Sequence, residues 1–333
     1  MSSNKLCDSI YISFLIASEK VFSCTEAARC QPFGDNGPAH DAFTRLLQRQ
    51  PPDTEALWND AKSIVQPKNG FLILDDTTLD KSYAKRMDLV YHLWSGKHHR
   101  VVSGINITTL LWTDGTAIIP IDFRVYDKDV NGKTKNDHFQ DMLATARERG
   151  FEPRFVLFDS WYASIDNIKI LRKYGWHWQT QLKKNRLVNP DDTKNMQIQD
   201  IDILPEGRIV HLKAYGFIKV FRKVAKDGDL EYWATDVLDM TEAEREELAG
   251  FSWKIEEYHR GIKQFCGVEK CQARKGKSQI ANIMFSIKAF IRLEVARLKT
   301  GMSWFEQKRR IVRNAIGSYI YSQQNLIIGG PTA

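Results

Sequence analysis

Residues 71–76 read FLILDD, an apolar run that ends abruptly in two aspartates. Residues 154–159 repeat the pattern as RFVLFD, which ends on Asp159. Short apolar runs bounded in this way are typical of buried strands. Open α/β folds bind their ligands beyond the carboxyl ends of such strands. The two runs therefore predict two strands that present carboxylates at one edge of a sheet, although an aspartate after a single strand also commonly caps a turn.

The segments around these runs predict an α/β core in which helices flank a mixed sheet. Strands and helices alternate along this part of the chain, as expected for helices packed on a sheet. The expected strands are VVSGINITTLLW (101–112) and AIIPIDFRVY (117–126), joined by the turn TDG, and GWHWQTQL (175–182). The expected helices are NDHFQDMLATARERG (136–150) and SWYASIDNIKILRKYG (160–175).

The pattern divides the chain into five regions. Residues 1–66 are expected to be helical, either as a helix-turn-helix-like DNA-binding piece or as a plain helical cap. Residues 190–238 read as strands without helices and are interpreted as an inserted β module, after which the chain is helical again. The regions are 1–66, helical; 67–189, first part of the core; 190–238, inserted β module; 239–300, second part of the core; and 301–333, a basic helical tail.

Charge is concentrated near the C-terminus. The net charge is +7, yet residues 254–313 carry 15 Lys or Arg against 5 Glu and no Asp. Such a block favours a polyanionic partner, because phosphates neutralised by Lys and Arg release their counterions. A solvated helical face is the alternative interpretation.

The cysteines and the hydropathy indicate a cytoplasmic protein without a membrane partner. The five cysteines are odd in number and form no CxxC pair, so neither a zinc site nor a disulfide framework is expected. The apolar run within residues 9–18 is far shorter than the ~20 residues that a membrane span needs.

A third group of acidic residues lies in WKIEEYHRGIK, residues 253–263. Glu256, Arg260 and Lys263 stand at i, i+4 and i+7, on one face of the predicted helix, whereas Glu257 lies about 100° further round. Exposed helices often carry such pairs, at about 0.2–0.5 kcal/mol each. Together with the two strand-end aspartates, the pattern instead favours a site for two divalent cations, which prefer oxygen ligands. Two such ions stabilise the attacking and leaving oxygens of a phosphoryl transfer.

Three motifs in fixed order carry a family resemblance. LDDTT (74–78), FDSWY (158–162) and WKIEEYHRGIK (253–263), with a β insertion between the second and the third, resemble the DDE transposases of bacterial insertion sequences. The branch is the one with a Tyr-Arg-Glu-Lys signature around the third acid, and the likeness runs from about residue 70 to 300. The resemblance implies a ribonuclease H-like mixed sheet with flanking helices.

The resemblance also implies the site. Asp76, Asp159 and Glu256 match the three acids that are catalytic and hold two Mg²⁺ ions, with Mn²⁺ as a substitute, and Lys263 matches the signature lysine. Asp75 is the alternative to Asp76, because neighbouring residues of a strand point to opposite faces and only one of them can join Asp159. The Asp-Thr-Thr pattern favours Asp76.

The implied function is cut-and-paste DNA transposition. The protein is expected to cleave at terminal inverted repeats and to transfer the freed 3′ ends into target DNA, as a homodimer on DNA in the bacterial cytoplasm, at the nucleoid. Trp161 and Tyr162 are expected to pack beneath the site. Further DNA-binding candidates, each with a solvated or core position as its alternative, are Arg260, Lys183, Lys184, Arg186 and Trp233, the last as a base-stacking aromatic.

Two other functions stay open. Ala249 and Ser252 stand where the signature has Tyr and Arg. Their presence supports a catalytically inactive or repurposed transposase that binds DNA, whereas the three acids and Lys263 oppose it. A metal nuclease of the same fold that recognises the structure of its nucleic acid is the second alternative.

Overall fold

The computed structural model of the 333-residue chain describes residues 6–32, 37–49, 54–95, 100–127, 132–225 and 228–328. The chain divides into two compact units. We call residues 54–84 and 89–259 the sheet unit, and residues 1–53, 85–88 and 260–333 the helical unit. The five regions expected from sequence remain predictions beside this division.

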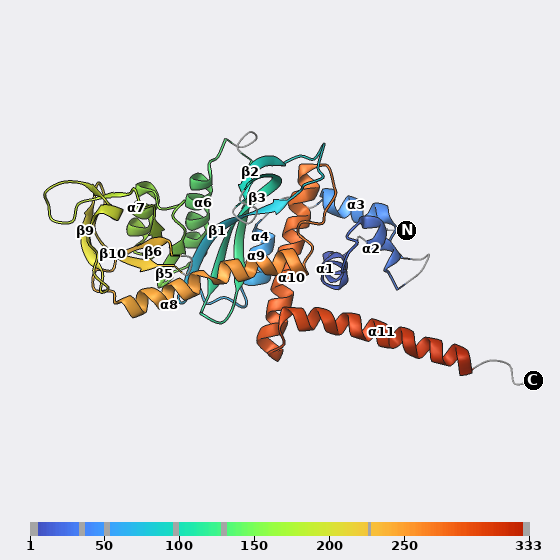
Figure 1. The fold of residues 1–333 in the computed structure, drawn as a ribbon. Helices are drawn as coiled ribbons and strands as arrows, with labels where there is room; N and C mark the ends of the chain where they lie inside the picture. Colours follow the sequence, from blue (N-terminus) through green and yellow to red (C-terminus); the bar gives the residue numbers. More distant parts are fainter. Residues whose placement is uncertain are drawn as a thin grey trace, which may run out of the picture. The chain divides into compact units, whose positions relative to one another are not determined.

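The sheet unit is built on one nine-stranded mixed sheet (Figure 1). Its strands are hydrogen-bonded in the order β2-β3-β1-β5-β6-β11-β10-β9, and β4 pairs with β3. The pairs β1–β5 and β5–β6 are parallel, and the other pairs are antiparallel. The strands are β1 (Phe71–Asp80), β2 (Tyr91–Ser95), β3 (Arg100–Thr113), β4 (Ile119–Val125), β5 (Phe155–Phe158), β6 (His177–Leu182), β9 (Arg208–Leu212), β10 (Gly216–Val224) and β11 (Leu230–Thr235). The mixed sheet and the β3–β4 hairpin confirm the prediction from sequence.

Strand β1 is longer than its apolar run predicts. The parallel ladder with β5 ends at the pair Leu74–Phe158, but β1 continues to Asp80 because the long strand β3 pairs with it as far as Gly104. The expectation that the first strand ends at its two aspartates is therefore wrong. The apolar run marks only the part of β1 that is buried between two neighbouring strands.

Helices α6 (Lys135–Glu148) and α7 (Ile165–Tyr174) follow β4 and β5 and pack on the sheet. Helix α6 begins with a capping box in which Thr134 and Asp137 bond to each other's backbone N–H groups, and Ser164 caps α7. Gly175 ends α7 in the left-handed conformation, with φ 72°, which glycine adopts without steric cost. These caps fix where each helix starts and therefore which side chains reach the sheet edge.

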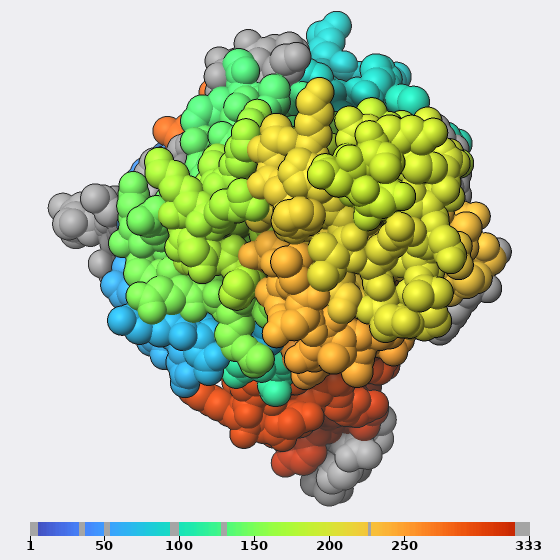
Figure 2. Space-filling view, turned by 90° about the vertical axis from the view of Figure 1, so that its left-hand side faces the viewer, coloured from blue at the N-terminus to red at the C-terminus, as the bar shows by residue number. Residues whose placement is uncertain are grey.

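Residues 190–238 contribute strands β9, β10 and β11, as the sequence pattern predicts. They extend the main sheet, because β11 pairs with β6. A two-stranded ladder, β7 (Leu187–Val188) with β8 (Met196–Gln197), precedes them. Helix α8 (Glu242–Ser252) contacts these strands: Lys223 on β10 forms an ion pair with Glu246. Figure 2 views the molecule from this end, where residues coloured yellow-green to yellow and light orange share the surface.

The helical unit contains helices from both ends of the sequence. Its centre is α10, in which 15 side chains are buried, and Tyr11 of α1 donates a 2.9 Å hydrogen bond to Asn282 there. Among the described residues, no helix is long and apolar enough to cross a membrane. The helices are α1 (Asp8–Ala17), α2 (Cys24–Arg29), α3 (His40–Arg49), α10 (Gly276–Thr300) and α11 (Trp304–Ile328). Helix α4 (Glu55–Ala61) belongs to the sheet unit, and the unit boundary falls within α9 (Lys254–Phe265).

Candidate active site

The acids of the sheet unit meet where the parallel ladder ends. Asp75 directly follows Leu74, and Asp159 directly follows Phe158, the partner of Leu74 in the register. Equivalent positions on adjacent parallel strands point to the same face. The backbone of β5 turns at once, because Asp159 accepts hydrogen bonds from the N–H groups of Trp161, at 3.0 Å, and Tyr162, at 3.2 Å. Although Asp75 and Asp76 are neighbours on β1, Asp159 lies close enough to interact with both: its repulsion acts on Asp75, and the repulsion of Asp76 acts on Asp159.

Asp76 is held by three donors. Its Oδ2 accepts hydrogen bonds from Asn106 Nδ2 at 2.6 Å and Lys135 Nζ at 2.7 Å, and its Oδ1 accepts from Tyr162 Oη at 2.8 Å. Asn106 lies on β3 and Lys135 is the first residue of α6. The site is therefore assembled from β1, β3, β5 and the start of α6.

A second grouping joins β1 to helix α9. One ligand atom each of Asp75, Glu256 and His259 lies within 4.8 Å of the others. Glu256 is exposed, Asp75 is half-buried and His259 is buried. Carboxylate oxygens and an imidazole nitrogen form a donor set for a divalent transition metal, and the carboxylates alone suit Mg²⁺. This set fits a bound cation.

His259 is the residue that the sequence analysis missed. The available signal was Glu-x-x-His: residues at i and i+3 lie on the same helical face, and this spacing supplies metal ligands in helical carboxylate sites. Glu257, which lies about 100° further round the helix, pairs with Lys254 at 3.4 Å.

Burial and the neighbouring carboxylates raise the pKa of Asp75 and of Asp159. Burial raises the pKa of Asp75 well above its usual range, and repulsion from Asp159, Asp76 and Glu256 adds to it. Burial, followed by repulsion from Asp76, raises the pKa of Asp159 to about 6. Burial and the neighbouring Asp76 also raise the pKa of Tyr162, so its phenol stays a hydrogen-bond donor. A cation bound among these groups would relieve their mutual repulsion.

The two aromatic residues after Asp159 have different surroundings. Tyr162 is 0% exposed and stacks on Phe139, which confirms that it packs beneath the site. Trp161 is 56% exposed, so the prediction that it packs beneath the site is wrong. The turn at Asp159 explains the difference, because it directs Tyr162 inward and Trp161 to the surface. The ammonium groups of Lys183 and Lys135 lie 5.0 and 5.7 Å from the centre of the Trp161 ring.

A cavity of about 640 Å³ begins at this tryptophan. It holds three basic side chains of the sheet unit, and none of the described residues that line it is acidic. Its polar and basic lining includes Ser160, Ser164, Lys183, Asn185, Arg186 and Lys213, with Trp161 at the aromatic wall. The cavity therefore offers positive charge and an aromatic ring directly after the second acid.

The predicted DNA-binding residues occupy different surroundings. Lys183 and Lys184 are exposed after β6, whereas the Arg186 guanidinium donates to the carbonyl of Ala163 and holds that loop. Trp233 is half-buried, donates to Glu231 at 2.9 Å and lies 5.6 Å beneath the Arg245 guanidinium of α8. In the helical unit, Arg260 is exposed, and Lys263 lies 3.8 Å from Glu269.

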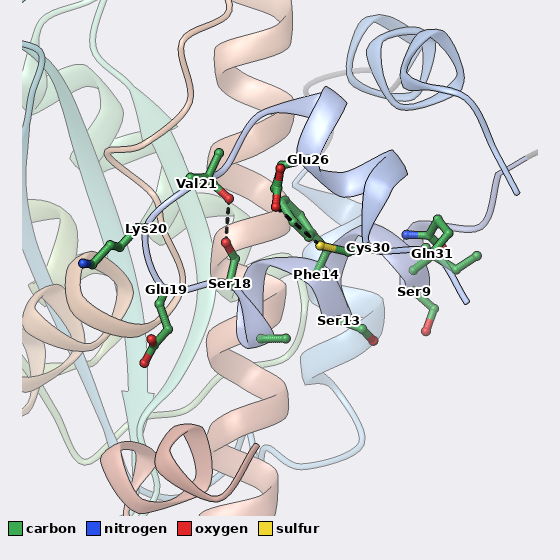
Figure 3. Close-up of a pocket in the computed structure, with 12 residues that line it drawn as sticks. Ser9, Ser13, Phe14, Ser18, Glu19, Lys20, Val21, Glu26, Cys30 and Gln31 are labelled. Carbon is green, nitrogen blue, oxygen red and sulfur yellow. Dashed lines mark hydrogen bonds between the residues drawn. The ribbon is translucent and has the colours of Figure 1, made fainter. Parts of the chain in front are cut away.

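A larger cavity, of about 760 Å³, lies in the helical unit between α1 and α2 (Figure 3). Figure 3 shows two local hydrogen bonds among its lining residues: the Ser18 hydroxyl donates to the Val21 carbonyl, and the Cys30 thiol donates to the Glu26 carboxylate. Its ionisable lining residues include Glu19, Lys20 and Glu26, but none of the acids described above lines it. The chemistry of the acidic cluster, rather than cavity size, therefore identifies the candidate site.

A protein family and a solved structure match this chain. The model of the DDE superfamily endonuclease family matches residues 27–199. No curated protein sequence matches the chain. The piggyBac transposase, in a cryo-EM synaptic complex with hairpin DNA, superposes with a TM-score of 0.56 at 11% identity, over 98% of this chain and 72% of that one. This likeness confirms the predicted ribonuclease H-like fold.

Two further structures superpose poorly. The C-terminal lobe of a budding yeast Argonaute gives a TM-score of 0.25 at 11% identity, over 74% of this chain and 60% of that one. The Mos1 transposase paired-end complex with the left transposon end gives 0.21 at 13% identity, over 54% and 59%.

Proposed function

Because the chain belongs to the DDE superfamily of endonucleases, we propose that it is a cut-and-paste DNA transposase of the insertion-sequence branch. It would cleave DNA at terminal inverted repeats and transfer the freed 3′ ends into target DNA. The observation that supports the proposal is the grouping of carboxylates from β1, the end of β5 and helix α9 in one unit, where burial and the neighbouring carboxylates raise the pKa of Asp75 and of Asp159.

Asp76, Asp159 and Glu256 are the proposed metal ligands. A bound pair of Mg²⁺ or Mn²⁺ ions would supply stabilisation of the charge on the attacking and leaving oxygens of the phosphodiester. The protein's own contribution is to hold the carboxylates: Tyr162 and Asn106 orient Asp76, and the backbone turn orients Asp159. Asp75 and His259 flank Glu256 and complete the donor set.

The substrate DNA is proposed to bind along the basic residues. The cavity at Trp161 lies next to Asp159 in the chain and offers Lys183 and Lys213 to phosphates. Lys263 and Arg260 would hold further phosphates from the same helix that carries Glu256, and Lys184, Arg186 and Trp233 are the remaining proposed contacts. Two DNA ends have to be cut together, so the acting form is proposed to be a homodimer on DNA at the bacterial nucleoid.

A DNA-binding protein without catalysis is the second candidate. Ser252 and Ala249 replace the signature arginine and tyrosine, and the Ser252 hydroxyl donates to the Ala249 carbonyl at 2.7 Å. Neither side chain is long enough to reach a distant phosphate. This candidate predicts binding of terminal repeats without nicking.

A nicking assay beside a binding titration tests the proposal. Asp159→Ala and Glu256→Ala should bind terminal-repeat DNA at least as tightly as the wild type but cleave it undetectably, because loss of a carboxylate removes no phosphate contact. Lys263→Ala should bind more weakly, with a salt dependence shallower by about one phosphate contact. Glu257→Ala is the matched control and should cleave normally.

Three outcomes would contradict the proposal in different ways. Binding without nicking by the wild type supports the DNA-binding candidate. Cleavage that depends on the structure of the DNA and not on the repeat sequence indicates a structure-specific nuclease. Normal cleavage by the Asp159 variant would eliminate the carboxylate site.

A further inference from the structure

The ion pair between Lys135 and Asp76 occupies the position that a divalent cation would take on this carboxylate. Lys135 Nζ lies 2.7 Å from Asp76 Oδ2, and both side chains are largely enclosed, with 20% and 17% of their surfaces exposed. The Asn106 amide donates to the same oxygen, and the Tyr162 hydroxyl donates to the other. Both oxygens of Asp76 are therefore engaged by side chains of the protein.

Lys135 stands at an unfavourable position for a cation. It is the first residue of α6, held there by the capping box of Thr134 and Asp137. The N-terminus of a helix carries partial positive charge, which disfavours a lysine in the first turn. The helix therefore does not explain why the ammonium group lies here. The ion-pair partner of Lys135 is Asp76.

The ammonium group and a divalent ion cannot share Asp76 without strong repulsion. Mg²⁺ binds carboxylate oxygens at about 2.0–2.1 Å. An ion on Oδ2 would therefore lie within about 5 Å of Nζ at its present distance, where charges interact strongly in a partly enclosed site. Asn106 and Tyr162 are neutral donors and would keep Asp76 oriented after the ammonium left.

Two aromatic rings lie near the ammonium group of Lys135. Lys135 Nζ lies 5.7 Å from the centre of the exposed Trp161 ring and 5.9 Å from that of Tyr126. Aromatic faces attract cations at such distances. The side chain thus needs only a short displacement to exchange the carboxylate for an aromatic face.

We propose that Lys135 is an internal counter-ion that holds Asp76 in the metal-free protein and is displaced when a divalent cation binds. The pair keeps the carboxylate oriented and prevents its repulsion of Asp159 from opening the site. It also lowers the affinity for the cation, because binding has to break it. The inference rests on the proposed function, since it assigns Asp76 to the cation site.

Mn²⁺ titration of Lys135→Gln tests the inference, with Lys133→Gln as the matched control. Lys133 lies two residues earlier and pairs with Asp141 at 2.6 Å, and both of these side chains are more than 40% exposed. By calorimetry, Lys135→Gln should bind Mn²⁺ on the order of tenfold more tightly than the wild type, whereas Lys133→Gln should match it. In buffer that contains a chelator, Lys135→Gln should melt at a lower temperature than the wild type. Added Mn²⁺ should raise the melting temperature of Lys135→Gln more than that of the wild type.

A second measurement needs no variant. Labelling with an amine-reactive reagent, read by mass spectrometry, should modify Lys135 of the wild type faster once Mn²⁺ is bound, while Lys133 reacts at an unchanged rate. Equal Mn²⁺ affinity for both glutamine variants, or a Lys135 labelling rate that does not change when Mn²⁺ binds, would overturn this inference but not the proposed function. Absence of Mn²⁺ binding in the wild type and in Lys135→Gln would overturn both it and the proposed metal-dependent function.

Discussion

Replacing Asp159 by Asn should stabilise the metal-free protein at neutral pH, although it removes a proposed ligand. Burial and repulsion from Asp76 raise the pKa of Asp159 from 3.8 to about 6. The folded state therefore binds the proton more tightly than the unfolded state does. The resulting stability is fully present below about pH 4 and is lost as the pH rises through 6, where the carboxylate ionises.

The size of the effect follows from the shift. A change of about two pKa units corresponds to about 3 kcal/mol for a fully enclosed group. Other side chains surround Asp159, yet more than a third of its surface stays exposed, so solvent screening reduces this to about 1 kcal/mol. Asparagine has nearly the shape of the protonated carboxyl and lacks the charge, so the variant avoids this penalty at every pH.

Thermal unfolding in a chelator, at pH 4 and at pH 8, measures the difference. The Asp159→Asn substitution should leave the melting temperature nearly unchanged at pH 4 and raise it by about 2–4 °C at pH 8. Saturating Mg²⁺ should then stabilise the wild type by mass action and reverse the order of the two proteins. Asp166→Asn changes the same group at an exposed position of the first turn of α7, and it should show neither effect.

One result would refute this reasoning. If Asp159→Asn were less stable than the wild type at pH 8 in the chelator, the carboxylate would be stabilised by its surroundings. The acidic cluster would then hold no repulsion for a cation to relieve.

Three shorter predictions follow from other contacts. His259→Ala should weaken Mn²⁺ binding about tenfold in calorimetry while its circular dichroism spectrum stays unchanged, because the imidazole lies in the donor set; equal affinity would remove it from that set. Glu294→Ala should cost about 3–5 kcal/mol in urea unfolding, because the fully buried carboxylate accepts from Arg297 at 2.7 Å; a cost below 1 kcal/mol would contradict this. Gly104→Ala should cost about 1–3 kcal/mol, because its Cβ would lie 2.5 Å from Thr78 Cγ2; unchanged stability would show that β1 shifts freely.

The strands of the sheet could be predicted from the sequence where burial on both faces requires a continuous run of apolar residues. FLIL and FVLF are flanked by strands on both sides, so both read as continuous apolar runs. Residues 77–80 could not be assigned to β1 in this way, because their pairing depends on the distant strand β3 and their side chains are mostly half-buried. Strand β2 was missed for a similar reason: its only partner among the described strands is β3.

The types of residue that form the site could be predicted from the sequence, but the contacts between them could not. Acidic residues after apolar runs pointed to the right edge of the sheet, yet nothing in the local sequence links Lys135 to Asp76, which lie 59 residues apart. The exposure of Trp161 depends on a backbone turn formed around Asp159, which a one-dimensional pattern does not contain. His259 was the exception, since its spacing from Glu256 was visible in the sequence.

The position of the acids also follows from a change in the pairing of one strand. Up to Leu74, β1 is bonded to β3 on one side and to β5 on the other, and the β1–β5 ladder then ends at the pair Leu74–Phe158. Asp75 and Asp76 lie on the part of β1 that still pairs with β3, while β5 turns away at Asp159. Carboxylates that repel one another need such a rigid support, because a flexible loop would let them separate. We therefore expect substitutions that loosen the β1–β3 ladder, such as Gly104→Ala, to weaken Mn²⁺ binding in proportion to their effect on stability. A destabilised Gly104 variant that retained full Mn²⁺ affinity would show that the acids do not depend on this support.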